Sequence, residues 1–275
     1  MLPATADSIA RYLADHAATH SLATLRQRLA ALSQWHLTQG FADPVRTPLV
    51  RQVFKGIRAL HPAQPRQATP LGIDTLQQVI QALEAEAEQP VRRLRARRDQ
   101  ALLLLGFWRG LRSDELARLQ VEHIRAQAGV GIELYLPRSK GDRQNLGSRL
   151  RTPALNSLCP VQAYLNWITA AGIAKGPVFR GIDRWGRLAE TPLHSNSLIP
   201  LMRGILERGG VPAAAYSSHS LRRGFATWAT ANGWDLKSLM AYVGWKDVKS
   251  ALRYIDPAAS FGGLAQDGPP ALPGQ

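Results

Sequence analysis

The chain has 275 residues, 45 % of them hydrophobic, which suits one large domain or two ordinary ones with a buried core. Its 34 lysines and arginines against 20 acidic residues give a formal charge of +14, which indicates a polyanion as partner, with nucleic acid the first candidate. The single cysteine excludes an intrachain disulfide and a cysteine metal cluster, and the sequence has no secretion signal or membrane-length apolar run, so we expect a cytoplasmic protein.

The first sixty residues predict a small helical domain. Apolar residues recur at helical spacing over residues 5–20, and Ser21 is suited to cap a second helix that reaches residue 39. A third helix is expected over residues 48–60, because Pro48 at its first position loses no needed backbone donor. A basic stripe on this helix is either a solvated face or a phosphate-binding one. The stripe consists of Arg51, Lys55 and Arg58.

A linker is predicted over residues 63–70, because three prolines fall within residues 61–70 and apolar periodicity is absent there. We therefore expect a helical domain over residues 1–62 and a second domain over residues 71–261. The remaining residues, 262–275, are rich in proline, glycine and alanine, and we expect them to be disordered.

The second domain is predicted to be mainly α-helical. Asp74 and Gln77 resemble a capping box for its first helix, and Ser113 and Ser218 are suited to cap two later ones. A basic run over residues 92–98 precedes a nearly all-apolar, buried helix, and we expect this run to face DNA. The longer helices are expected over residues 74–88, 99–108, 160–171, 195–208, 219–231 and 235–242.

A β-hairpin adds a small antiparallel sheet to this mainly α fold. Apolar and polar residues alternate over residues 132–136, a turn follows at 139–142, and residues 149–155 suit the returning strand. Lys140 is expected at the tip or shoulder of this hairpin, with Arg138 and Arg143 close to it in the sequence. Lys140 is either an exposed turn lysine or a proton donor brought to a reactive site.

Arg112 follows a glycine turn at the end of the buried apolar helix. An arginine in this position needs an anion to offset its desolvation. Glu115, three residues later, is one such partner. The alternative is a bound phosphate on Arg112, with Glu115 orienting a neighbouring catalytic side chain.

His219 and Arg222 are expected one turn apart near the start of a helix. Their side chains then project from one face, where backbone donors already favour an anion. A structural histidine is the competing interpretation. Arg223 points elsewhere, toward DNA or an acid.

Tyr254 closes the set of reactive side chains, although a tyrosine among aliphatic residues is usually a packing residue. Two arginines, a histidine, a lysine and a tyrosine together suit one task, which is to hold a phosphodiester while the tyrosine oxygen attacks it. The sequence shows no acidic cluster able to hold magnesium, which argues against a two-metal nuclease and for no metal or other cofactor.

Five motifs in this order resemble the tyrosine site-specific recombinases, the lambda-integrase family. The resemblance covers most of the chain and implies a helical core-binding domain of the SAM-like type, a linker and a catalytic domain. It implies that Arg112 and Arg222 bind the phosphate, that Glu115 supports them, and that Tyr254 is the nucleophile. The motifs are Gly110-Leu111-Arg112-Ser113-Asp114-Glu115-Leu116, the hairpin Lys140, His219-Ser220-Leu221-Arg222-Arg223, Val243-Gly244-Trp245, and Tyr254.

The chain departs from that pattern in two places. Trp245 stands where many members have histidine, although members of the Cre type also carry tryptophan, which keeps an N–H donor but not a proton shuttle. The segment after Tyr254 is short and poorly suited to pass a helix to a neighbouring protomer.

The resemblance implies a recombinase that cleaves and rejoins double-stranded DNA through a 3′-phosphotyrosyl intermediate, acting as a tetramer on two recombination sites. In this interpretation Lys140 is the general acid, His219 serves proton transfer or hydrogen bonding, and Trp245 contacts the phosphate. The sequence leaves two alternatives open: a DNA-relaxing enzyme similar to type IB topoisomerases, and a non-catalytic DNA-binding protein of the same fold.

Overall fold

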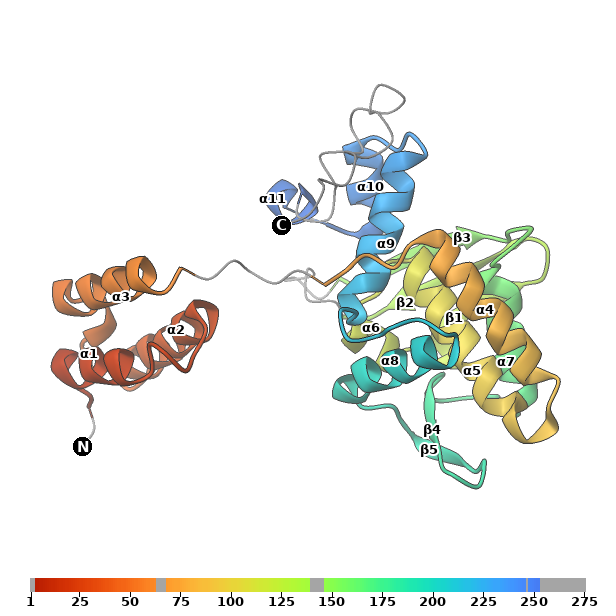
Figure 1. Ribbon diagram of the computed structural model, residues 1–275, viewed down its shortest axis with the longest axis horizontal. Coiled ribbons are helices and arrows are strands. Elements are labelled where there is room, and N and C mark those ends of the chain that lie inside the picture. Colours follow the sequence, from red (N-terminus) through yellow and green to blue (C-terminus); the bar gives the residue numbers. More distant parts are fainter. Residues whose placement is uncertain (1–2, 63–67, 139–145, 246, 253–275) are drawn as a thin grey trace, which may run out of the picture. The chain divides into compact units, whose positions relative to one another are not determined.

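The chain divides into two compact units, with the boundary between Gln67 and Ala68 (Figure 1). The computed structural model describes residues 3–62, 68–138, 146–245 and 247–252. Each unit has a hydrophobic core of its own. In the described part of the chain, no helix has the length and apolar character needed to cross a membrane.

The first unit is a small bundle in which the three predicted helices are confirmed. Ser21 caps the second helix as predicted, since its Oγ accepts a hydrogen bond from the Thr24 N–H at 3.1 Å. Leu13 and Leu25 are fully buried and centre the core. The first helix ends at Asp15, earlier than predicted. The elements are α1 (Ala6–Asp15), α2 (Leu22–Thr38), the 3₁₀ turn η1 (Pro44–Arg46) and α3 (Pro48–Leu60).

The second unit is mainly helical, and α4 and α5 lie side by side in it (Figure 1). Three predicted N-caps were wrong by one or two residues, since Asp74, Ser113 and Ser218 lie within the first two positions of their helices. Gly72 precedes α4, Arg112 precedes α6 and Ser217 precedes α9. The helices are α4 (Ile73–Ala87), α5 (Pro90–Trp108), α6 (Ser113–Ala117), α7 (Pro160–Ala171), α8 (Leu198–Arg208), α9 (Ser218–Ala231), α10 (Leu236–Val243) and α11 (Val248–Leu252), with 3₁₀ turns η2 (Val121–His123) and η3 (Ser195–Ser197).

Two antiparallel sheets accompany the helices. The two strands of the predicted hairpin are confirmed as β2 (Gly131–Leu136) and β3 (Ser148–Pro153), in register with Leu134 opposite Leu150. The predicted turn at 139–142 lies outside the described residues. Strand β1 (Ile124–Gln127) extends this sheet in the order β1-β2-β3 and was not predicted, since four residues are too few for a periodicity to be recognised. A second hairpin, β4 (Arg180–Ile182) and β5 (Leu188–Pro192), lies in a segment for which no strand was predicted.

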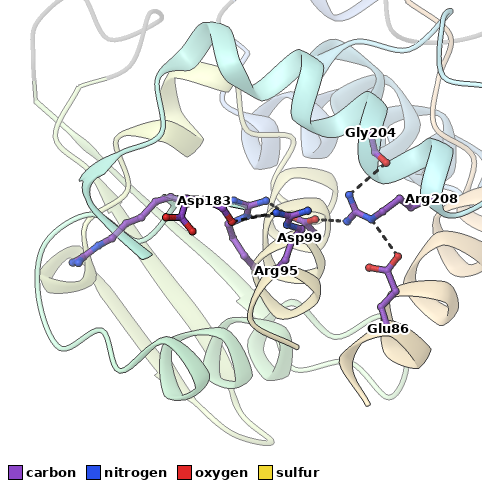
Figure 2. A network of polar contacts seen from close by, with 8 residues as sticks. Glu86, Arg95, Asp99, Asp183, Gly204 and Arg208 are labelled. Carbon is purple, nitrogen blue, oxygen red and sulfur yellow. Dashed lines mark hydrogen bonds and ion pairs between the residues drawn. The ribbon is translucent and has the colours of Figure 1, made fainter. Parts of the chain in front are cut away.

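The basic run before the apolar part of α5 is directed inward in part, contrary to the prediction that it faces DNA. Arg98 is buried and donates to Asp99 Oδ1 from Nε at 2.9 Å and Nη2 at 2.7 Å. Figure 2 shows Arg208 of α8 bridging Asp99 and Glu86. Arg95 reaches the Asp183 carbonyl oxygen at the end of β4, at 3.4 Å. These guanidinium groups hold α4, α5, α8 and the β4–β5 hairpin together.

Candidate active site

A cavity of about 250 Å³ brings together segments that are far apart in the sequence. The turn between α5 and α6 contributes Arg112 and Glu115, and the β2–β3 hairpin contributes Leu136 and Ser148. Trp245, which follows α10, also lines the cavity. Three of the predicted site residues, Arg112, Glu115 and Trp245, therefore lie on one cavity.

Glu115 fixes Arg112 through both of its carboxylate oxygens. Oε2 accepts from the Arg112 backbone N–H at 2.8 Å, and Oε1 accepts from Arg112 Nη1 at 2.6 Å. Glu115 is buried, whereas 26 % of the Arg112 side chain remains exposed. The carboxylate caps α6 and orients the guanidinium with one set of contacts, so Arg112 is presented at the cavity wall in a defined geometry.

Arg222 is buried on α9 and is held by backbone carbonyls. Its Nη1 donates to the Gly110 carbonyl oxygen at 2.6 Å and its Nη2 to that of Val243 at 3.2 Å. Its guanidinium carbon lies 5.0 Å from the centre of the Trp245 ring. These contacts join α9 both to the turn that precedes Arg112 and to the end of α10, so the two predicted phosphate ligands are part of one packed unit.

Glycines make the close approach at this junction possible. Gly110 has φ +54°, and a Cβ there would meet Val243 Cγ1 at 3.2 Å and Arg222 Cγ at 3.3 Å. Gly244 ends α10 in the left-handed conformation with φ 73°. The chain reverses there, and the buried Trp245 donates its backbone N–H to the Met240 carbonyl oxygen at 2.9 Å.

His219 lies in the first turn of α9 with an exposed side chain, and its N–H donates to Ser217 Oγ at 3.2 Å. It is not among the described residues that line the 250 Å³ cavity. Arg223, next to Arg222 on the helix, is half-buried. The predicted one-turn spacing of His219 and Arg222 is present, but the two side chains differ sharply in exposure.

The remaining predicted site residues divide into two groups. Arg51, Lys55 and Arg58 are exposed on α3, and Arg138 is exposed just after β2. Lys140, Arg143 and Tyr254 lie outside the described residues.

Arg109 is a lining residue of the cavity that sequence reasoning missed. It is buried, and burial lowers the pKa of its guanidinium. The Tyr242 ring centre lies 3.8 Å from its guanidinium carbon. The only signal in the sequence is a charged residue at the end of an apolar helix, next to the Gly110-Leu111-Arg112 motif.

Comparison with known proteins places the chain in a family. The sequence profile of the phage integrase family matches residues 74–260. The chain belongs to the phage integrase family. It is a tyrosine recombinase by this membership, as the sequence motifs predicted.

Relatives of the family match over different lengths. An integrase/recombinase XerD homologue of Selenomonas ruminantium is 30 % identical over 265 residues, which cover 94 % of this chain and 76 % of that protein. The tyrosine recombinase XerD of Brucella suis biovar 1 is 30 % identical over 177 residues, which cover 63 % of this chain and 53 % of the relative.

Solved structures share the fold at low sequence identity. The XerH site-specific recombinase, bound to its palindromic difH substrate after cleavage, aligns with a TM-score of 0.64 and 16 % identity, over 92 % of this chain and 69 % of XerH. A lambda integrase dimer bound to a COC′ core site aligns with a TM-score of 0.58 and 17 % identity, over 98 % of this chain and 68 % of that one. The predicted mainly α fold with a small antiparallel sheet is confirmed.

Proposed function

We propose that this phage integrase family member is a site-specific recombinase that cleaves and rejoins double-stranded DNA through a 3′-phosphotyrosyl bond to Tyr254. The observation that carries the proposal is that Arg222 is bonded both to the turn that leads to Arg112 and to the end of α10 that leads to Trp245. Glu115 orients Arg112, the Gly110 and Val243 carbonyls hold Arg222, and the Trp245 ring lies against Arg222.

The chemistry follows from the needs of phosphoryl transfer. The Tyr254 oxygen attacks the scissile phosphorus, a new O–P bond forms, and the bond to the 5′-oxygen breaks. Arg112 and Arg222 stabilise the charge on the non-bridging oxygens, which is the main demand of this transition state. Lys140 gives the leaving oxygen its proton, His219 serves proton transfer or hydrogen bonding, and the Trp245 indole N–H donates to the phosphate.

Rejoining reverses these steps, when a 5′-hydroxyl attacks the phosphotyrosyl bond and releases the tyrosine. The linkage retains the energy of the phosphodiester, so the reaction needs no nucleotide and no metal. Exchange between two DNA sites requires several protomers, and we propose a tetramer that acts in the cytoplasm. The DNA complexes of XerH and lambda integrase support DNA as the partner.

The test begins with recovery of the preferred DNA site by selection from random sequences. Supercoiled plasmids with two copies, one copy or no copy of that site are then incubated with the chain. Recombinant circles that require two copies, together with a covalent protein–DNA adduct, are the expected result. Relaxation that ignores the site would indicate a topoisomerase-like enzyme, and binding without an adduct would indicate a non-catalytic protein.

A further inference from the structure

Arg109 makes three contacts that join separate elements of the second unit. Its Nη1 donates to the Arg151 carbonyl oxygen of β3 at 3.0 Å, and its Nη2 donates to the Tyr242 carbonyl oxygen of α10 at 2.5 Å. Its guanidinium carbon lies 3.8 Å from the centre of the Tyr242 ring. Arg109 itself caps the end of α5, three residues before Arg112.

A stabilising role alone does not account for a charge at this position. Arg109 is 4 % exposed, and among the residues that the structure describes it forms no ion pair with a carboxylate. Its Nε is buried and has no hydrogen-bond partner among those residues. Desolvating such a charge is unfavourable before hydrogen bonds offset it, and an apolar side chain would fill the same space without that loss.

The Arg109 guanidinium fixes the end of α10 and strand β3 relative to each other. Arg109 and Arg222 donate to consecutive carbonyls, those of Tyr242 and Val243, at the end of α10. The backbone reverses at Gly244 directly after them and places Trp245. On its other side Arg109 bonds to β3, which pairs with β2 and follows Lys140 in the sequence.

The Tyr242 ring, which lies against the Arg109 guanidinium, is itself held by neighbouring side chains. The Tyr242 ring stacks on Phe225 of α9 with centroids 5.1 Å apart, and it forms a T-shaped pair with the Trp234 ring, also with centroids 5.1 Å apart. The Tyr242 hydroxyl lies 3.2 Å from Thr152 Oγ1 on β3. The ring is therefore a fixed platform, and the guanidinium lies against it between α10 and β3.

We propose that Arg109 is a positioning residue for DNA cleavage, which sets the return strand of the β2–β3 hairpin and the Trp245 segment relative to Arg112. The inference rests on the proposed function of the site. Arg109 does not contact the DNA phosphate in this role; it acts through the Arg151 and Tyr242 carbonyls.

The experiment compares Arg109→Met and Arg109→Lys with Arg98→Met in the full-length chain. Arg98 is a matched control, because it is equally buried, it lies on α5, the helix that Arg109 caps, and its partner Asp99 keeps the contact with Arg208. Covalent adduct formation is measured over a range of concentrations of duplex bearing the selected site, and thermal unfolding gives the folded fraction. Misplacement of reacting groups by about 1 Å can slow a reaction on the order of 10²-fold, so a loss of this size in maximal rate is expected for Arg109→Met.

The half-saturating DNA concentration should stay within about twofold, since phosphate contacts over the whole interface set affinity. Arg109→Lys should recover part of the rate, because an ammonium can donate to a carbonyl but lacks the planar fork. Arg98→Met should cleave at the wild-type maximal rate per folded molecule.

Three results would overturn the inference. One is a wild-type maximal rate for Arg109→Met, and another is an equal loss in Arg109→Met and Arg98→Met. If Arg109→Met does not fold, Arg109→Lys decides, and a wild-type rate in folded Arg109→Lys overturns the role. A wild-type chain that binds the site but forms no adduct is a different failure, since it removes the proposed function and this inference with it.

Discussion

The nucleophile is a single oxygen, so one substitution tests it. Tyr254 follows Trp245 by nine residues and lies outside the described residues, so its role stays a prediction. Tyr254→Phe should bind duplex DNA with nearly unchanged affinity, because many phosphate contacts share the binding energy. It should form no covalent adduct. A gel under denaturing conditions measures this, and an adduct that persists in the Phe variant would assign the attack to another residue.

Lys140 presents a harder problem, because Arg138 and Arg143 are close in sequence and also basic. Arginine does not readily give up a proton, whereas lysine can once a site lowers its pKa. We expect Lys140→Ala to cleave ordinary DNA very slowly. It should recover much of its rate on DNA whose bridging 5′-oxygen is replaced by sulfur, because a thiolate leaves without protonation.

The substrate comparison also provides the control for Lys140. A lysine that only steadies the DNA would produce the same defect on the oxygen and sulfur substrates. That outcome would move the acid role to His219 or a neighbouring arginine. Single-turnover cleavage rates on the two DNAs, for the wild type and Lys140→Ala, distinguish these possibilities.

Residue-scale prediction succeeded where a motif lies within one short segment. Arg112 and Glu115 are three residues apart, and their pairing followed from helical spacing. Arg109 was missed because its partners, the Arg151 and Tyr242 carbonyls, come from β3 and α10. A backbone carbonyl carries no sequence signal, so only the fold reveals such a contact.

At the scale of elements, α6 is a helix of five residues whose start depends on one carboxylate. Glu115→Ala should lower the free energy of unfolding by roughly 1 kcal/mol, the usual effect of removing a cap. It should slow adduct formation as well, because Oε1 no longer orients the Arg112 guanidinium. Denaturant unfolding and single-turnover cleavage measure the two effects.

The neighbouring acid supplies the control for Glu115. Asp114 pairs with Arg118 on the exposed side of α6, and exposed pairs contribute little. Asp114→Ala should therefore change stability and cleavage only slightly. If Glu115→Ala were equally silent, the contacts of Glu115 would not orient Arg112 in solution.

Elements with strong end signals were predicted well. The helices α2, α3 and α7 match their predicted ranges closely, since Ser21, Pro48 and Pro160 mark their starts. Strands β1, β4 and β5 were missed because three to five residues are too few for a periodicity to be recognised. Tertiary pairing determines such strands, and the single sequence does not contain that information in readable form.

In the proposed reaction, arginine side chains and not a metal ion supply the positive charge that neutralises the phosphate. We expect site-specific cleavage in excess chelator to be as fast as without chelator, because Arg112 and Arg222 neutralise the phosphate. Adduct formation after extensive treatment with EDTA measures this. A loss of cleavage that magnesium restores would contradict the metal-free mechanism.

The net charge of +14 favours DNA binding, and exposed basic residues of the first unit allow a test of whether that unit takes part. Arg51, Lys55 and Arg58 are exposed along α3 of the first unit, spaced so that they can meet one DNA backbone. Changing all three to glutamine should weaken binding and lower the log–log salt slope by up to about three, roughly one for each phosphate that is no longer neutralised. The matched control changes Arg11 and Arg46, exposed arginines of the same unit that pair with Asp7 and Asp43. An unchanged slope in the triple variant, or full affinity in a chain limited to residues 66–275, would show that the second unit binds the duplex without the first.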